Sequence, residues 1–252
     1  MLFQPMLFQL SLTEQILIAA IFVWTGFVRS GLGFGGAALG LPLMLYIINQ
    51  PVYWLPIIGF HLLIFSSLTL RTRFKNVDWM YLKKSLVFIV PSSLIGVFGL
   101  LNLPNHLLII FIYSITLVYA IIWLFNLPIN SNKPWVDKLL LIFGGYVAGT
   151  SLTGAPLMVA VFMRHVVAEQ LRNTLFVLWF VLVSIKMSTF AFVGVDLQVI
   201  PALLLLPIAT IGHLIGLKTH QLILRNDKLF KRITGGVLAI ISISGLYYQF
   251  VG

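Results

Sequence analysis

The chain has 252 residues, of which 60% are hydrophobic and only 9% are charged, and its mean hydropathy is +1.05. About a quarter of the residues of a soluble domain are charged, so this composition excludes a soluble globular protein. The formal charge of +10 is expected to mark the cytoplasmic loops of a membrane protein rather than a nucleic-acid partner. The chain has no cysteine, which excludes disulfides and thiolate metal sites.

Apolar stretches of membrane-spanning length follow one another along almost the whole chain. Residues 1–9 contain no Lys or Arg, so we expect no secretory signal peptide there. The sequence predicts an all-α polytopic membrane protein. Its expected helical segments are 12–30, 36–48, 52–71, 79–101, 105–125, 138–149, 154–165, 169–193, 197–218 and 229–250.

Two glycine- and proline-containing stretches interrupt the apolar pattern. Residues 35–44 and 149–158 share the spacing Gly-x4-Gly-x-Pro-Leu-Met. Two further pairs match in the same order: Pro91-x3-Ile95-Gly96 with Pro207-x3-Ile211-Gly212, and Val77-Asp78 with Val195-Asp196. These matches indicate an internal duplication. We expect a first repeat over 1–126, a linker over 127–137 and a second repeat over 138–252.

Basic residues orient the loops, because Lys and Arg concentrate in cytoplasmic loops. The loop region after residue 70 carries Arg71, Arg73, Lys75, Lys83 and Lys84, whereas its second-half counterpart, 194–197, carries no basic residue. Loop 101–105 also has none, whereas its counterpart carries Lys218, Arg225, Lys228, Lys231 and Arg232. The charge bias is inverted between equivalent loops, which predicts two inverted-topology repeats.

An inverted repeat needs an odd number of membrane crossings in each half. Three long segments supply them in the first half (52–71, 79–101 and 105–125) and three in the second (169–193, 197–218 and 229–250). The glycine-broken stretches 12–48 and 138–165 must then leave the membrane on the side where they enter. We therefore expect two re-entrant helical hairpins with tips near the midplane and both termini outside. The alternative is that residues 12–30 cross the membrane completely, which would place the N-terminus inside.

In each expected hairpin the second half-helix begins at the tip. Its free N–H groups and the positive end of its dipole favour an anion. The expected substrate-binding residues are Gly33, Gly35, Gly36 and Ala37 at the first tip, and Thr150, Ser151, Thr153, Gly154 and Ala155 at the second. Side-chain hydroxyls occur only at the second tip, so we expect the two tips to contribute different hydrogen-bonding groups to the site. The plainer alternative is that these small residues only let helices pack closely.

Arg29 and Lys186 are basic residues inside apolar segments, where a charge is costly and commonly functional. Arg29 immediately precedes the first tip. Lys186 lies about 10 Å by helical rise from the outer end of its helix. Its ammonium either binds substrate or extends (snorkels) along the helix to the outer surface of the membrane. The six acids all fall at expected loops or helix ends: Glu14, Asp78, Asp137, Glu169, Asp196 and Asp227. A buried Arg29 without a carboxylate partner predicts a bound anion as its counter-ion.

His61 and His213 lie within helices and are candidates for a proton relay, although a hydrogen-bonded core position is the commoner role of such a residue. The chain has no His-Glu-x-x-His, Gly-x-Ser-x-Gly or phosphate-binding loop motif. We therefore expect no enzymatic activity, no catalytic residue, no metal site and no cofactor.

Several of these motifs resemble the TauE/SafE family of sulfite exporters, also called sulfonate-uptake permeases. The matches are Gly33-Phe-Gly-Gly36 with Pro42, Gly154-x-Pro156, Asp78-Trp79, and Ile95-Gly96 with its repeat. Residues 150–153 depart from the consecutive glycines that are usual in the family. The resemblance implies a multi-pass protein of the bacterial or archaeal cytoplasmic membrane that transports sulfite, thiosulfate, sulfoacetate or another sulfonate.

The combined expectation is a secondary transporter that moves a small sulfur-containing anion across the lipid bilayer by alternating access. A proton or another ion is a candidate coupling ion. A passive anion channel and a non-transporting membrane subunit remain alternatives, and a membrane enzyme would need a reacting pair of side chains. Transport direction and oligomeric state are left open at this point.

Overall fold

The computed structural model describes residues 6–71, 74–127, 133–225 and 227–251. In these ranges the chain is all-helical and has no strand. The elements are η1 (Met6–Gln9), α1 (Leu12–Leu32), α2 (Gly36–Met44), α3 (Pro51–Leu70), α4 (Trp79–Asn102), α5 (Asn105–Leu124), α6 (Pro134–Ser151), α7 (Ala155–His165), α8 (Ala168–Phe192), α9 (Val199–Arg225) and α10 (Asp227–Val251). The expected segments correspond to these helices one by one, except that α2 ends before residue 48, α6 begins before residue 138 and α9 continues past residue 218. Arg73 of the expected basic loop lies outside the described residues.

Seven helices in the described part of the chain are long and apolar enough to cross a membrane: α1, α3, α4, α5, α8, α9 and α10. This arrangement is that of an integral multi-pass membrane protein. The 21 residues of α1 extend about 31 Å, so its length permits the complete crossing that competes with the hairpin. Of these spanning helices, α3 and α8 are the most enclosed by the rest of the protein.

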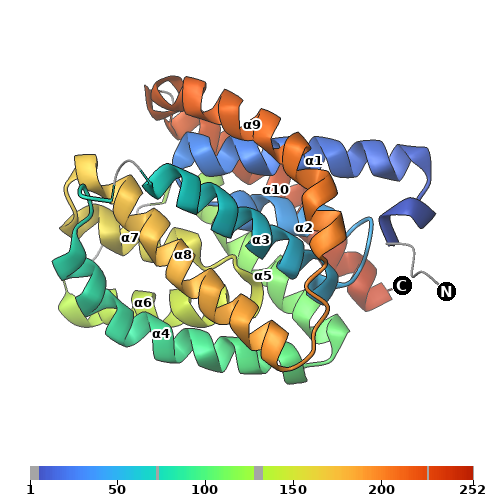
Figure 1. Ribbon diagram of the computed structural model, residues 1–252, viewed down its shortest axis with the longest axis horizontal. Helices are drawn as coiled ribbons and strands as arrows, with labels where there is room; N and C mark the ends of the chain where they lie inside the picture. The colour runs from blue at the N-terminus through green and yellow to red at the C-terminus, as the bar shows by residue number, and fades with distance from the viewer. Residues whose placement is uncertain (1–5, 72–73, 128–132, 226, 252) are drawn as a thin grey trace.

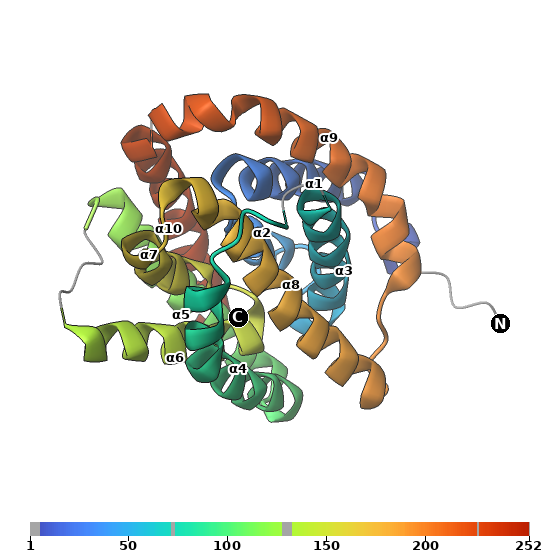
Figure 2. The ribbon, with the colours of Figure 1, turned by 60° about the vertical axis from the view of Figure 1, so that its left-hand side comes forward.

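The N-terminal and C-terminal halves are intertwined. Helix α1 lies along α9, and α4 lies along α6, so each of these pairs joins one helix from each half (Figure 1; Figure 2). Glycines permit this approach: a Cβ on Gly212 would overlap the carbonyl oxygen of Val23, and a Cβ on Gly96 would overlap that of Tyr146. Small residues bring helix backbones close together in membranes. The halves therefore form one packed body rather than two separate units.

The helical path breaks between α1 and α2 and again between α6 and α7. At the first break Gly33 and Gly35 adopt left-handed backbone conformations, with φ of 82° and 85°, which glycine takes without steric cost. At the second break Leu152 has φ of 58°. Both breaks fall where the glycine-containing stretches predict them, because glycine in a helix interior is unfavourable by about 1 kcal/mol relative to alanine.

The two copies of the Gly-x4-Gly-x-Pro spacing do not occupy equivalent places, which corrects the sequence interpretation. Gly40 and Pro42 lie inside α2, whereas Gly154 precedes α7 and Pro156 is its second residue. Proline in a first turn sacrifices no helical hydrogen bond, whereas interior proline does. The same spacing therefore serves different local purposes in the two halves.

Candidate functional site

The two helix breaks meet at a small cavity of about 30 Å³. The first break contributes Arg29 and residues 34–37, the second contributes Ala148, Leu152 and Ala155, and the walls are completed by Leu62 of α3 and by Trp179, Leu182 and Val183 of α8. Leu62 and Leu182 lie near the middle of their helices, so the cavity is at mid-depth of the two most enclosed spanning helices. A cavity of this volume has room for about one or two water molecules. The tips are therefore nearly closed on each other.

Arg29 is the charged group of this cavity. Its side chain is 5% exposed, and its guanidinium carbon lies 4.2 Å from the centroid of the Phe65 ring. Its Nε and Nη2 atoms are buried without a hydrogen-bond partner, and Arg29 forms no ion pair in the described part of the chain. A guanidinium presents its N–H groups as a planar fork that matches an oxyanion.

Trp179 supplies a donor that the sequence interpretation missed. Its Nε1 atom is buried without a hydrogen-bond partner, and its side chain lines the same cavity as Arg29. A buried indole N–H usually finds an acceptor. Tryptophan in membrane proteins favours the two interfaces, so a tryptophan in the middle of α8 is a signal that the sequence does contain.

The first tip brings backbone donors to the cavity. Gly36 and Ala37 are the first two residues of the nine-residue helix α2, and the first N–H groups of a helix have no acceptor within it. The dipole of α2 adds partial positive charge at the same place. Gly33 does not line the cavity; its N–H donates to the carbonyl of Arg29 at 2.9 Å and closes the end of α1.

The second tip contributes less than expected. Ala155 lines the cavity, but Thr150, Ser151, Thr153 and Gly154 do not. The hydroxyl of Thr150 donates to the carbonyl of Tyr146 at 2.8 Å, and that of Ser151 donates to the carbonyl of Val147 at 3.0 Å. Thr153 Oγ1 lies 2.6 Å from Ser151 Oγ, so the three hydroxyls are satisfied locally.

Gly154 has a packing role. A Cβ on this residue would overlap the carbonyl oxygen of Gly144 in α6. In addition, Pro156 has no N–H to offer in the first turn of α7. Between the two tips, the backbone and side-chain donors that line the central cavity therefore come from the first rather than from the hydroxyls of the second.

Lys186 is 1% exposed, and its Nζ atom has no hydrogen-bond partner in the described residues. Of the two expected alternatives, snorkelling to the surface is therefore wrong. Lys186 is not among the residues that line the central cavity, but it lies one helical turn beyond Leu182 and Val183, which are. Lys186 is thus a second buried basic side chain without a hydrogen-bond partner among the described residues, on a helix that lines the central cavity.

The two candidate relay histidines are held by static hydrogen bonds. His61 Nε2 lies 2.7 Å from the carbonyl oxygen of Ala202 and must donate to it. Ser30 Oγ gives its proton to the carbonyl of Gly26 at 2.6 Å, so it accepts from His213 Nδ1 at 2.9 Å. Neither imidazole is hydrogen-bonded to another titratable side chain in the described residues. These contacts favour the core interpretation over a relay.

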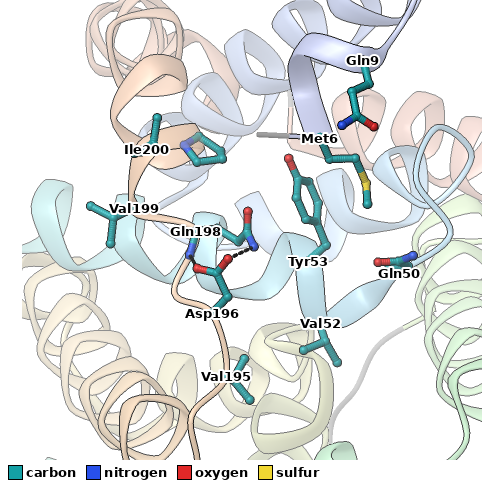
Figure 3. A pocket seen from close by; sticks show the side chains of 11 residues that line it. Met6, Gln9, Gln50, Val52, Tyr53, Val195, Asp196, Gln198, Val199 and Ile200 are labelled. Atoms are coloured by element: carbon teal, nitrogen blue, oxygen red, sulfur yellow. Dashed lines mark hydrogen bonds between the residues drawn. The ribbon is translucent and has the colours of Figure 1, made fainter. Parts of the chain in front are cut away.

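A wider cavity of about 680 Å³ lies where η1, the start of α3 and the loop between α8 and α9 meet (Figure 3). Gln9, which precedes α1, and Gln50, which follows α2, both line it. The two ends of the α1–α2 segment therefore lie together. Asp196 accepts a hydrogen bond from the Gln198 side chain at 2.8 Å, and none of the described residues that line this cavity is basic.

A third cavity, of about 420 Å³, has the opposite electrostatic character. Arg164, which is ion-paired with Asp137 of α6, and Lys231 line it, together with Phe34 of the first tip and Asn126, which follows the end of α5. Asn105, at the other end of α5, donates to the carbonyl of Asn49 beside the first wide cavity at 2.8 Å. The acidic and basic cavities therefore lie toward opposite ends of α5, with the central cavity between the helix breaks.

Comparison with known families decides the class of protein. The sequence model described as "Sulfite exporter TauE/SafE" matches residues 17–245, a range that includes both helix breaks and Arg29. The chain belongs to the sulfite exporter TauE/SafE family. TauE/SafE proteins are membrane transporters, so membership implies a small anionic substrate and a lipid bilayer as partners. No curated protein and no solved structure matches the chain. No cluster of His, Asp and Glu suited to a metal ion occurs among the described residues.

Proposed function

We propose that this TauE/SafE protein is a secondary transporter that moves sulfite, thiosulfate, sulfoacetate or another small sulfonate by alternating access. The observation that carries the proposal is Arg29, whose buried Nε and Nη2 atoms lack hydrogen-bond partners beside the small central cavity. Burial of an unpaired charge is costly, and a bound anion removes that cost. The anion is the missing counter-ion of Arg29.

The donors around the cavity fit an oxyanion. Arg29 binds two oxygen atoms of the anion through its planar fork, and Trp179 Nε1 donates to a third. The amides of Gly36 and Ala37 and the dipole of α2 complete the positive surroundings. The other expected residues of the tips, Gly33, Thr150, Ser151, Thr153 and Gly154, shape the helix breaks. Ala155 is the residue by which the start of α7 lines the central cavity.

The topology that accompanies this function is a pair of inverted repeats over 1–126 and 138–252, each with a re-entrant hairpin and three spanning helices. Two observations support it. Gly96 meets Tyr146 across α4 and α6, and Gly212 meets Val23 across α9 and α1, so equivalent glycines make equivalent contacts between the halves. Gln9 and Gln50 line one cavity, which favours entry and exit of the first hairpin on one side.

The cavities support alternating access. A central cavity of about 30 Å³ is too small for an anion, while wider cavities of about 680 and 420 Å³ lie toward opposite ends of α5. In the proposed cycle this corresponds to an empty, contracted site, which widens when the anion binds at Arg29. The basic cavity, with Arg164 and Lys231, faces the cytoplasm of a bacterium or archaeon by the positive-inside rule and attracts the anion.

Counterflow in proteoliposomes tests the proposal. Vesicles loaded with unlabelled sulfite should transiently accumulate radiolabelled sulfite, and the initial rate should saturate with concentration. Thiosulfate and sulfonates are then compared as internal anions, and an imposed proton gradient tests the coupling ion. Flux that neither saturates nor shows counterflow would identify a passive channel, and the absence of flux would identify a non-transporting subunit. Either result would overturn the proposal.

A further inference from the structure

Phe34 lies between two cavities. Its side chain lines both the central cavity that contains Arg29 and the basic cavity that contains Arg164 and Lys231. Its ring packs edge-on against Trp123, with ring centroids 6.4 Å apart and an interplanar angle of 77°. An anion that moves from the basic cavity to Arg29 meets this ring first.

The backbone around Phe34 allows the ring to move. Phe34 is the middle residue of the three that separate α1 from α2, and both of its neighbours, Gly33 and Gly35, have a left-handed φ. Glycine populates both signs of φ readily. Hinges in domain motions often lie at the ends of helices or strands, and this three-residue segment between two helices is suited to act as one. The hinge does not require either helix to unfold.

The same segment is attached to the proposed anion site. The N–H of Gly33 donates to the carbonyl of Arg29 at 2.9 Å, and a Cβ on Gly36 would lie 3.1 Å from Cβ of Arg29. A shift of Arg29 or of the α2 amides toward a bound anion therefore also displaces the backbone of Phe34. This connection links occupancy of the site to the position of the ring.

We propose that Phe34 is the gate between the basic cavity and the anion site, and that it swings on Gly33 and Gly35 as the anion enters or leaves Arg29. This inference rests on the proposed transport function. It assigns a specific residue to one of the two barriers that alternating access requires, and it identifies the basic cavity as the vestibule on that side.

Cysteine accessibility tests the gate directly, because the chain has no cysteine and any introduced thiol is unique. Val183→Cys places the thiol on the wall of the central cavity, and Ala160→Cys places it in the basic cavity as the matched control. The purified proteins are reacted with an anionic, water-soluble methanethiosulfonate reagent, each with Phe34 and with Phe34→Ala.

Phe34→Ala should raise the labelling rate of Val183→Cys by about tenfold or more, which corresponds to removal of a barrier of about 1.4 kcal/mol. The rate at Ala160→Cys should change by less than about twofold, and Phe34→Trp should keep Val183→Cys slow. An unchanged rate at Val183→Cys would overturn the gate, and so would an equal increase at both positions, which indicates general loosening. If Phe34→Ala does not fold, Phe34→Leu replaces it with the same criteria.

Labelling requires no transport, so its outcome is separate from that of the counterflow experiment. A selective increase in labelling without sulfite counterflow would overturn the proposed function and leave the barrier at Phe34 established. Counterflow with unchanged labelling would retain the transporter and overturn the gate.

Discussion

The guanidinium of Arg29 lies over the face of the Phe65 ring, with its carbon 4.2 Å from the ring centroid. A cation over an aromatic face is stabilised by about 0.5–2 kcal/mol, and the ring accepts no conventional hydrogen bond in this contact. The Nε and Nη2 atoms of Arg29 remain without a hydrogen-bond partner. His213 packs on the same ring, with centroids 4.5 Å apart. Phe65 therefore orients Arg29 without occupying its donors.

Replacement of Phe65 by leucine removes this face. Phe65→Leu should weaken the binding of sulfite by about 3- to 30-fold, which corresponds to loss of a cation–π contact of about 0.5–2 kcal/mol. Phe190→Leu is the matched control, because Phe190 is equally enclosed in the core but makes no ring contact with Arg29. Both variants should lower the melting temperature, and binding of radiolabelled sulfite separates them. Equal affinities in the two variants would show that Phe65 only fills space.

Trp179→Phe removes one N–H and keeps most of the ring volume. A hydrogen bond to a charged group contributes about 1.5–3 kcal/mol, so anion affinity should fall by about 10- to 100-fold. The anion-free protein should lose little stability, because the buried Nε1 has no acceptor to lose. Trp135→Phe, at an exposed position of α6, provides the control in the same titration. Unchanged affinity in Trp179→Phe would remove Trp179 from the site.

Lys186→Met should make the anion-free protein more stable. Replacement of a buried charge by an apolar side chain of similar volume commonly stabilises a protein by about 1–4 kcal/mol, and the Nζ atom of Lys186 has no partner to lose. Thermal unfolding in detergent without added anion provides the measurement. Lys84→Met, at an exposed position of α4, should leave the melting temperature nearly unchanged. A lower melting temperature for Lys186→Met would mean that the ammonium makes a stabilising contact.

The contact between α4 and α6 is tested by two alanine substitutions on one helix. Gly96→Ala places a Cβ against the carbonyl of Tyr146, whereas the nearest atom to a Cβ on Gly99 is Tyr146 Oη at 3.5 Å. Overpacking costs about 1–3 kcal/mol, so Gly96→Ala should lower the melting temperature by several degrees. Gly99→Ala should be neutral or stabilising by up to about 1 kcal/mol, because alanine favours helix. A reversed order would contradict the packing described here.

The helices are predictable from the sequence because apolar runs bounded by Pro, Gly and Asn define them. Pro51 begins α3, Asp78 caps α4 by accepting from the N–H of Tyr81, and Asn105 begins α5. The end of α9 is not predictable in this way, since Lys218 and the polar residues after it continue the helix beyond the apolar stretch. Spacing alone also misleads at Pro42 and Pro156, because it does not distinguish a helix interior from a first turn.

The candidate site was predictable in part. Arg29 stands out as a charge in an apolar segment, and glycine marks the break that carries Gly35 and Gly36. The hydroxyls of Thr150 and Ser151 were overvalued, since hydroxyls in helices commonly bond the carbonyl four residues earlier, as both do here. The sequence does not single out Phe34 at the cavity or Phe65 beside Arg29, because the chain has 20 phenylalanines and only tertiary packing selects these two.

Equilibrium binding of radiolabelled sulfite to the purified protein tests the role of Arg29 most directly. The natural chain should bind sulfite saturably, and thiosulfate or a small sulfonate should compete. Arg29→Ala should weaken binding by at least about 30-fold, because loss of a charged partner from a desolvated pair costs about 2–5 kcal/mol. Arg71→Ala, which removes an exposed positive charge at the end of α3, should bind normally. Undiminished binding by Arg29→Ala, or no binding of any of these anions to the natural chain, would contradict an anion site at Arg29.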